Sequence, residues 1–227
     1  MNWTTHEVGE GITVESAVVG FAEANCYIIA SAATGDAAVI DPGTSDRREL
    51  DAIIQEIERL GVNVGVILNT HGHPDHMEGN DILKRALEAD VAIHELDGLK
   101  LTDPDRNASR LFGMDIRVAP ADRLLADDEI VEIGDITLKT VHTPGHSSGG
   151  VSFVGEGFAF TGDTLFAGGV GRTDLPCACD ADLIAWEVLM ESISTKLMTL
   201  PGETVLLPGH GPSTTVERER QSNSYIR

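Results

Sequence analysis

Short apolar runs alternate with helical segments along this chain, and this order restricts the folds that are open to it. Apolar runs bounded by turn residues predict β-strands at residues 12–19, 26–30, 37–40, 64–68, 91–94, 130–141, 150–154, 158–160 and 204–207. Apolar residues at helical spacing predict helices at residues 50–60, 79–89 and 181–200, the first of which begins near Ser45 or Asp46 and ends at Gly61. Residues 97–128 show neither pattern clearly. Strands outnumber helices but are interrupted by them, so we predict a layered α/β or α+β domain in which helices cover sheets.

The sequence shows no boundary between domains. Its 227 residues contain no repeat, low-complexity tract or linker, so we predict one domain over residues 1–227. No stretch approaches the roughly 18 uninterrupted apolar residues of a membrane helix, and no secretory signal pattern is visible, so we expect a cytoplasmic protein without a membrane partner. Three cysteines are too few and too odd in number for a disulfide framework. A homo-oligomer is compatible with this composition.

The charge balance excludes one class of partner. Lysine and arginine number 16 against 37 aspartates and glutamates, which gives a formal net charge of −21. Such a surface repels phosphate backbones, so we expect no nucleic-acid binding. The acidic surface is interpreted either as a solvated coat that aids solubility or as an adaptation to high salt, and the sequence leaves both open.

Histidines gather where predicted strands end. The densest group is the stretch Thr70-His71-Gly72-His73-Pro74-Asp75-His76, which we expect to be a loop because Pro74 disfavours helical dihedrals at His73. Three further polar residues follow later apolar runs in turns rich in Gly, Pro or Thr: His146, Asp163 and His210. Loops that leave the same edge of a sheet can converge, so these side chains are candidates for one site.

Imidazoles and carboxylates without thiolates are typical ligands of Zn²⁺, Fe²⁺ or Mn²⁺. Seven candidates exceed the needs of one tetrahedral ion, whereas two ions about 3.5–4 Å apart and joined by a bridging carboxylate would use them all. The histidine spacing excludes a helical H-E-x-x-H zinc site, because His71, His73 and His76 are not i, i+4 pairs. The alternative is a set of unrelated histidines that cap turns.

The stretch from Thr70 to His76 resembles the T-H-x-H-x-D-H signature of the metallo-β-lactamase superfamily, and the later turns match in order. The resemblance spans Asp41 to His210 and implies an αββα four-layer sandwich, the metallo-β-lactamase fold, with metals at one edge between the sheets. It implies one metal site of His71, His73 and His146, a second of Asp75, His76 and His210, and Asp163 bridging both. Asp41 matches an aspartate that orients a ligand imidazole, and its alternative role is that of a turn residue before Pro42.

A second segment narrows the resemblance. Residues 165–174, which contain Gly171-Arg172-Thr173-Asp174, resemble a stretch of glyoxalase II-like thioester hydrolases and of persulfide dioxygenases. Arg172 is a candidate to pair with a substrate carboxylate or with Asp174. The chain departs from its relatives at Cys177-Ala178-Cys179, which we interpret as small packed residues, with redox chemistry or metal binding as the alternative. Little sequence follows His210, so the helical extension that binds glutathione in glyoxalase II is not expected, and glutathione specificity is not implied.

The resemblance predicts a metal-dependent hydrolase of a small-molecule thioester. Two divalent ions, zinc first and iron or manganese as alternatives, would share a bridging hydroxide that attacks the acyl carbon, with Asp75 and Asp163 as catalytic ligands. The nearest alternative is a mononuclear iron enzyme of the persulfide dioxygenase kind that uses His71, His146 and Asp163. Cleavage of a lactone or phosphodiester and a non-catalytic metal-binding protein are further alternatives.

Overall fold

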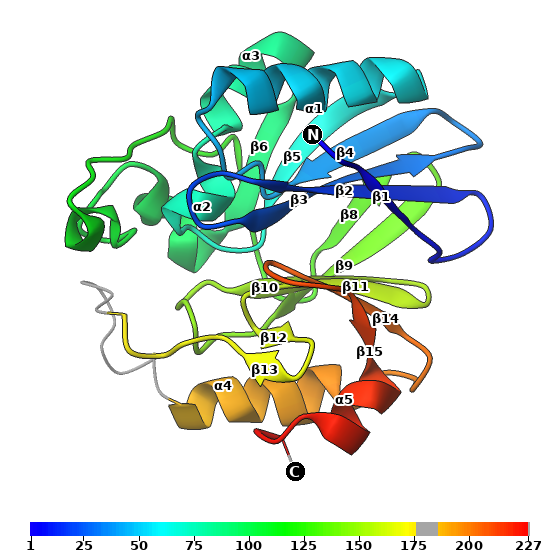
Figure 1. Cartoon of the computed structure of the whole chain (residues 1–227), viewed down its shortest axis with the longest axis vertical. Coiled ribbons are helices and arrows are strands. Elements are labelled where there is room, and N and C mark those ends of the chain that lie inside the picture. Colours follow the sequence, from blue (N-terminus) through cyan, green and yellow to red (C-terminus); the bar gives the residue numbers. More distant parts are fainter. Residues whose placement is uncertain (176–185, 227) are drawn as a thin grey trace.

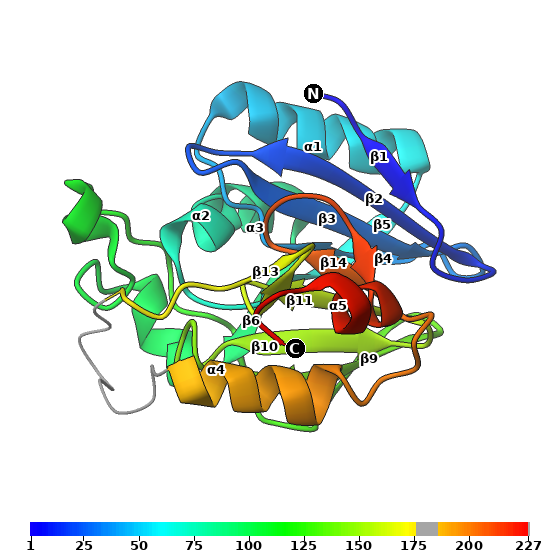
Figure 2. The same ribbon diagram turned by 60° about the horizontal axis from the view of Figure 1, so that its bottom comes forward.

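Two β-sheets lie face to face, and helices cover the outer face of each (Figure 1). The computed structural model describes residues 1–175 and 186–226. In that part of the chain, α1 and α3 cover the first sheet, and Figure 2 shows α4 and α5 on the outer side of the second. This arrangement is the predicted four-layer αββα sandwich.

The first sheet has seven strands in sequence order: β1 (Thr4–His6), β2 (Ile12–Val19), β3 (Ala24–Ser31), β4 (Asp36–Ile40), β5 (Asn63–Asn69), β6 (Asp90–His94) and β7 (Arg123–Leu125). Strands β1 to β4 pair antiparallel, whereas β4 to β7 are parallel. Parallel neighbours need crossovers, which α1 (Arg47–Leu60) and α3 (Asn80–Leu87) provide. The carboxyl ends of β4 and β5 therefore meet at one edge of the sheet.

The second sheet has the order β15-β14-β11-β10-β9-β8. Its strands are β8 (Ile130–Ile133), β9 (Ile136–His142), β10 (Val151–Gly155), β11 (Phe158–Gly162), β14 (Val205–Pro208) and β15 (Thr214–Thr215). Strands β11 and β14 are parallel, so the turns that follow them leave the same edge. A two-stranded ribbon of β12 (Leu165–Phe166) and β13 (Gly169–Val170) follows β11, and α4 (Trp186–Ser192) and α5 (Val216–Ser222) complete the outer layer.

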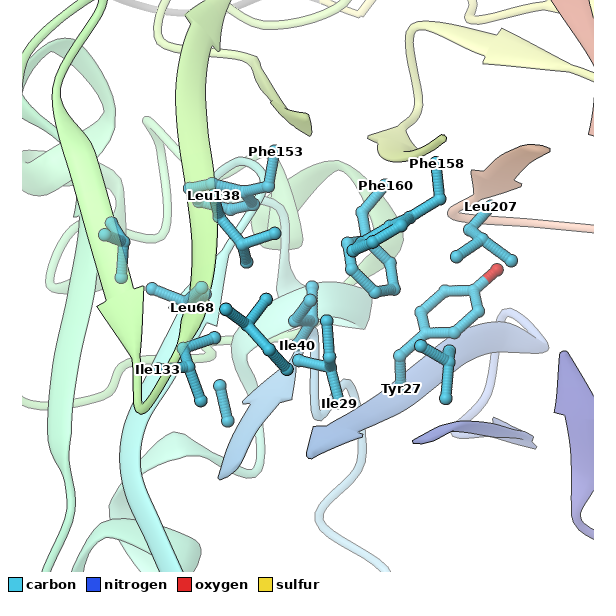
Figure 3. Packing of buried hydrophobic residues seen from close by; sticks show 14 of the residues in the cluster. Tyr27, Ile29, Ile40, Leu68, Ile133, Leu138, Phe153, Phe158, Phe160 and Leu207 are labelled. Carbon is cyan, nitrogen blue, oxygen red and sulfur yellow. The ribbon is translucent and has the colours of Figure 1, made fainter. Parts of the chain in front are cut away.

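The core between the sheets explains the alternation of apolar residues in their strands. Figure 3 shows side chains from both sheets meeting in one cluster, with these ten labelled: Tyr27, Ile29, Ile40, Leu68, Ile133, Leu138, Phe153, Phe158, Phe160 and Leu207. A second buried cluster joins the first sheet to α1 and α3, and a third joins the second sheet to α4. Burial of apolar surface in these three clusters stabilises the four-layer arrangement.

Helix α1 ends where the sequence predicts. Asp46 is its N-cap and accepts hydrogen bonds from the backbone N–H groups of Arg48 and Glu49. Gly61 ends the helix in the left-handed region with φ of 67°, a conformation that favours glycine. The apolar stripe of the helix, including Leu50 and Ile53, is fully buried against the sheet.

Several predicted boundaries were wrong. The stretch after His73 is not all loop, because Pro74 occupies the first position of a one-turn helix, α2 (Pro74–Met77), a place that suits its fixed φ. The run 130–141 is two strands joined at Gly134, which has φ of 61°. The helix predicted at 181–200 passes from α4 into a π-helical turn, η3 (Ile193–Leu197), and residues 181–185 lie outside the described residues.

Sequence periodicity did not predict two 3₁₀-helices: η1 (Glu95–Leu101), which extends into the segment 97–128, and η2 (Ser109–Phe112), which lies within it. Cys177 and Cys179 lie outside the described residues, so their predicted packing stays a prediction. Within the described residues, no helix is long and apolar enough to cross a membrane.

Candidate metal centre

Four turns at one edge of the sandwich bring the seven candidate ligands together. The stretch after β5 carries His71, His73, Asp75 and His76, and the turns after β9, β11 and β14 carry His146, Asp163 and His210. Their nitrogen and oxygen atoms form three overlapping groups, in each of which all ligand atoms lie within 4.8 Å of one another: His71–His73–His146, His71–His76–Asp163 and Asp75–His76–His210. Residues up to 139 positions apart in the sequence thus share one centre (210 − 71 = 139).

Asp163 stands between the two halves of this centre. One of its oxygens, Oδ2, lies 3.5 Å from Nε2 of His146 and 3.5 Å from Nε2 of His210. The other, Oδ1, lies 3.5 Å from Nε2 of His76. On the far side, Asp75 Oδ2 is 3.3 Å from Nε2 of His210. A single carboxylate therefore faces histidines of both groups, which is the geometry that the resemblance implies for Asp163.

Several ligand atoms at the centre lack a hydrogen-bond partner. Nε2 of His71, His73 and His76 and Oδ1 of Asp163 are buried and unpaired. An unsatisfied buried polar atom costs about 1–3 kcal/mol, so four at one place call for an explanation. The unpaired atoms belong to imidazoles and a carboxylate, the donor types that divalent transition metals bind. The residues present therefore fit a metal centre.

Hydrogen bonds outside the centre fix how the imidazoles point. Nδ1 of His71 contacts Thr70 Oγ1 at 3.1 Å, and Nδ1 of His76 contacts Asp41 Oδ2 at 3.0 Å. Nδ1 of His146 and of His210 contact the backbone oxygens of Arg172 and Glu23, at 2.8 and 3.2 Å. An imidazole that donates from Nδ1 keeps its lone pair on Nε2, so these contacts direct Nε2 of the four rings toward the centre. Nε2 of His146 also contacts Nδ1 of His73 at 2.9 Å.

Asp41 links this centre to the first sheet. It follows β4 with φ of 52°, a left-handed conformation that aspartate tolerates better than most residues. Its carboxylate accepts hydrogen bonds from the Thr70 backbone N–H at 2.8 Å and from the Thr70 hydroxyl at 2.6 Å, in addition to His76. The aspartate is 1% exposed, so these contacts act in a dry environment.

Burial and neighbouring charges set the protonation of the centre. Burial, together with the neighbouring histidines, holds the pKa of His71 well below its usual value, which favours the neutral imidazole. Burial also lowers the pKa of His146. For His76 burial alone would lower the pKa, but three nearby carboxylates, Asp75 foremost, raise it to about 10. The three carboxylates thus favour a proton on His76, because its positive charge balances theirs.

Sequence reasoning missed a buried ion pair that lies behind the centre. Asp97 and Lys100, both on η1, are 0% and 1% exposed and pair at 2.5 Å. Asp97 Oδ2 accepts hydrogen bonds from Gly72 N–H at 2.8 Å and from Ser147 Oγ at 2.5 Å, and Oδ1 accepts from Gly149 N–H at 2.6 Å. The pair therefore ties the loop of His71 and His73 to the loop of His146. The signal in the sequence is that Asp97 and Lys100 lie three residues apart, but the segment around them shows no helical periodicity from which their burial could be predicted.

Arg172 pairs with a protein carboxylate in this structure. Its guanidinium makes two contacts with Asp174, Nε to Oδ1 at 2.7 Å and Nη2 to Oδ2 at 2.9 Å. This is the second of the two roles that the sequence left open for Arg172. Its backbone oxygen contacts Nδ1 of His146, one of the candidate ligands.

A cavity of about 450 Å³ opens onto the centre. Its lining includes five of the seven candidate ligands: His73, Asp75, His146, Asp163 and His210. The volume lies in the range of roughly 300–1,000 Å³ that is typical of small-molecule sites. A small molecule in this cavity would therefore contact ligand atoms from both halves of the centre.

Comparison with known proteins decides the family. The profile of the metallo-beta-lactamase superfamily matches residues 19–210, which include every candidate ligand. This chain belongs to that superfamily. The predicted metallo-β-lactamase fold is confirmed by a solved structure: the BLEG-1 B3 metallo-β-lactamase has a TM-score of 0.85 at 34% identity, over 94% of this chain and 99% of the other.

Relatives within the superfamily carry different names. The chain is 36% identical to the probable metallo-hydrolase YqgX of Bacillus subtilis, over 92% of this chain and 94% of the relative. It is 35% identical to the hydroxyacylglutathione hydrolase GloC of Haemophilus influenzae, over 84% and 87%. The structure of TTHA1623 in a di-iron-bound form has a TM-score of 0.77 at 32% identity, over 92% and 98%. This superfamily member thus resembles proteins named for hydrolysis and one that holds two metal ions.

Proposed function

We propose that this protein is a metal-dependent hydrolase that cleaves a small-molecule thioester. The observation that carries the proposal is the convergence of seven imidazole and carboxylate side chains, four of whose buried atoms lack a partner, beside an open cavity. The likeness to a hydroxyacylglutathione hydrolase at 35% identity supports the thioester as substrate. We propose two divalent ions, zinc in the first instance, held by the two histidine groups with Asp163 between them.

The reaction needs a nucleophile and stabilisation of negative charge. Divalent ions at these residues would supply a Lewis acid for the carbonyl oxygen and lower the pKa of water from 15.7 to about 7. In hydrolysis the water oxygen bonds to the acyl carbon, the carbon–sulfur bond breaks, and a water proton ends on the sulfur. The products are a carboxylic acid and a thiol. A thiol of pKa about 8.5 is a good leaving group, so no dedicated acid is required.

The chain's own residues hold and orient these parts. Asp75 lines the cavity, and its carboxylate can accept a hydrogen bond from the attacking water. Burial would raise the pKa of Asp75, but the adjoining His76 and His210 lower it, so the carboxylate stays ionised at neutral pH. Arg172 and Glu23 hold the His146 and His210 rings through backbone oxygens. Ligands that are already oriented need little rearrangement when metal and substrate bind.

The proposal is tested by metal content and thiol release together. Protein purified without added metal is analysed by mass spectrometry for metals, and thioester cleavage is followed with a thiol reagent. We expect two divalent ions per chain and hydrolysis that a chelator abolishes. Asp163→Asn should lose at least one ion and at least about 100-fold in kcat/KM, more than residues that only orient a ligand. His6→Gln, at a histidine on β1 that contacts Ser16, is the matched control.

Other outcomes would contradict the proposal. Asp163→Asn with two bound ions and undiminished turnover would refute the bridging role. One iron per chain, with oxygen consumed in the presence of a persulfide, would replace hydrolysis by dioxygenation. Cleavage of a lactone, a phosphodiester or a β-lactam at a higher kcat/KM than any thioester would keep the hydrolase and reject the thioester. No turnover with two ions bound would leave a metal-binding protein.

A further inference from the structure

Apolar side chains line the cavity beside the candidate ligands. Three phenylalanines from three separate elements line it: Phe21 in the turn between β2 and β3, Phe112 at the end of η2, and Phe166 on β12. Val170 and Leu175 add further apolar surface. The lining of the cavity therefore combines polar ligand atoms with apolar side chains.

Half of the phenylalanines of this chain line the cavity. The sequence has six phenylalanines. Phe153, Phe158 and Phe160 are buried in the core between the sheets, and the other three line the cavity. Phe21 and Phe112 are each 55% exposed, so they contribute little to the core. Exposed phenyl rings are unfavourable in water, and a ligand that covers them recovers that free energy.

Among the described residues that line the cavity, none carries an unpaired cationic group. Arg172 is the only lysine or arginine among its described lining residues, and its guanidinium is already paired with Asp174. The chain as a whole has a formal net charge of −21. An anionic group beyond the reach of the centre would thus meet repulsion rather than a partner.

From these observations we infer that the site is selective for thioesters with apolar, uncharged groups, aliphatic or aromatic, and discriminates against polyanionic thiol carriers. The inference rests on the proposed function and specifies its substrate class. The acyl carbon lies over the ligand atoms, and the apolar group covers Phe21, Phe112 and Phe166. The expected order of preference places a simple alkanoyl thioester of an uncharged thiol above hydroxyacyl thioesters and above thioesters of glutathione or coenzyme A.

Matched thioesters test this order. Acetyl, butanoyl and hexanoyl thioesters of N-acetylcysteamine vary only in chain length, and we expect kcat/KM to rise about fourfold for each added methylene group until the cavity is filled. Lactoyl thioesters test the effect of a hydroxyl. The same hexanoyl group on glutathione and on coenzyme A tests the carrier, and we expect kcat/KM at least about tenfold lower at low ionic strength, with the difference shrinking as salt is added.

Variants connect the order to the phenylalanines. Phe112→Ser and Phe21→Ser should reduce the gain for each methylene group to less than about twofold, because the surface that the chain covers is gone. Leu124→Ser is the matched control: Leu124 is 58% exposed, and it lies on β7 outside the cavity lining. Its dependence on chain length should equal that of the unmodified protein. Calorimetry with the uncleavable thioethers S-hexyl-N-acetylcysteamine and S-hexylglutathione measures the same preference without turnover.

The outcomes separate the two proposals. Hydrolysis that is fastest with lactoylglutathione, or that ignores chain length, would overturn the substrate class and leave the thioester hydrolase intact. If no thioester of any kind is cleaved by metal-loaded protein, the proposed function fails, and the substrate class fails with it. If Phe112→Ser converts a dimer to a monomer in sedimentation and leaves the chain-length dependence unchanged, the exposed rings belong to an interface between copies, and the inference is wrong.

Discussion

Replacing Asp97 with asparagine should destabilise the fold more than any substitution of comparable size on the surface. The side chain keeps its shape and one acceptor oxygen but loses its charge, which leaves the ammonium of Lys100 buried, 1% exposed, without a counter-ion. Breaking a buried pair by removing one partner costs about 3–5 kcal/mol. The amide also cannot accept all the hydrogen bonds that Gly72, Ser147 and Gly149 donate to the carboxylate. We therefore expect the free energy of unfolding to fall by at least about 3 kcal/mol.

The assay is urea unfolding of protein kept in chelator, so that metal binding does not contribute to the free energy of unfolding. Asp51→Asn is the control, because Asp51 pairs with Arg47 on exposed α1 and should cost less than about 1 kcal/mol. Adding Lys100→Met to Asp97→Asn removes the uncompensated charge and should recover about half of the loss. A loss below 1 kcal/mol for Asp97→Asn, or no recovery in the double variant, would refute the reasoning.

Two further substitutions test the geometry of the centre. Asp41→Asn should weaken metal binding by about 10–100-fold, measured in a competition with a zinc indicator. The reason is that the amide cannot accept hydrogen bonds from both Thr70 groups and from Nδ1 of His76, as the carboxylate does. Unchanged affinity would contradict this role. Gly209→Ala should reduce the amount of bound metal, because a Cβ at this position would lie 2.2 Å from Oδ1 of Asp163. The control is Gly65→Ala on β5, whose Cβ would meet nothing within 4 Å and which should retain both ions. Equal metal content in the two variants would contradict the prediction and show that the centre adjusts at no cost.

The parts of the fold that sequence predicted are those where local pattern and burial agree. Helix α1 has a capping aspartate, an apolar stripe and a terminal glycine, and each signal is local. Strands β1 and β7 are three residues long and lie at the edge of their sheet, with the sequences TTH and RLL. Such short strands show no alternation, because pairing with a neighbour rather than a buried face defines them. They could not be predicted from periodicity.

Some residues of the candidate site could likewise be predicted from the sequence, and others could not. The ligand residues could be named because they cluster in turns that follow apolar runs, and because the motif from Thr70 to His76 resembles a known signature. The Asp97–Lys100 pair could not, because an aspartate and a lysine three residues apart usually form an exposed pair. Only the fold shows that both side chains are buried between the loops of His73 and His146. Contacts over 50 positions, such as Asp97 to Ser147, are invisible to local patterns.

Two buried carboxylates beside the centre, Asp41 and Asp97, explain how a group of unpaired ligand atoms can hold its shape. Asp41 accepts from the backbone N–H and the hydroxyl of Thr70, and Asp97 accepts from the backbone N–H of Gly72, so their contacts lie on either side of His71. The charge of Asp97 is balanced by Lys100 rather than by a ligand histidine. His71 is therefore held on both sides by groups that would not themselves bind metal. It follows that removing metal with a chelator should leave the loop in place, while removing either carboxylate should displace the ligands even when metal is in excess.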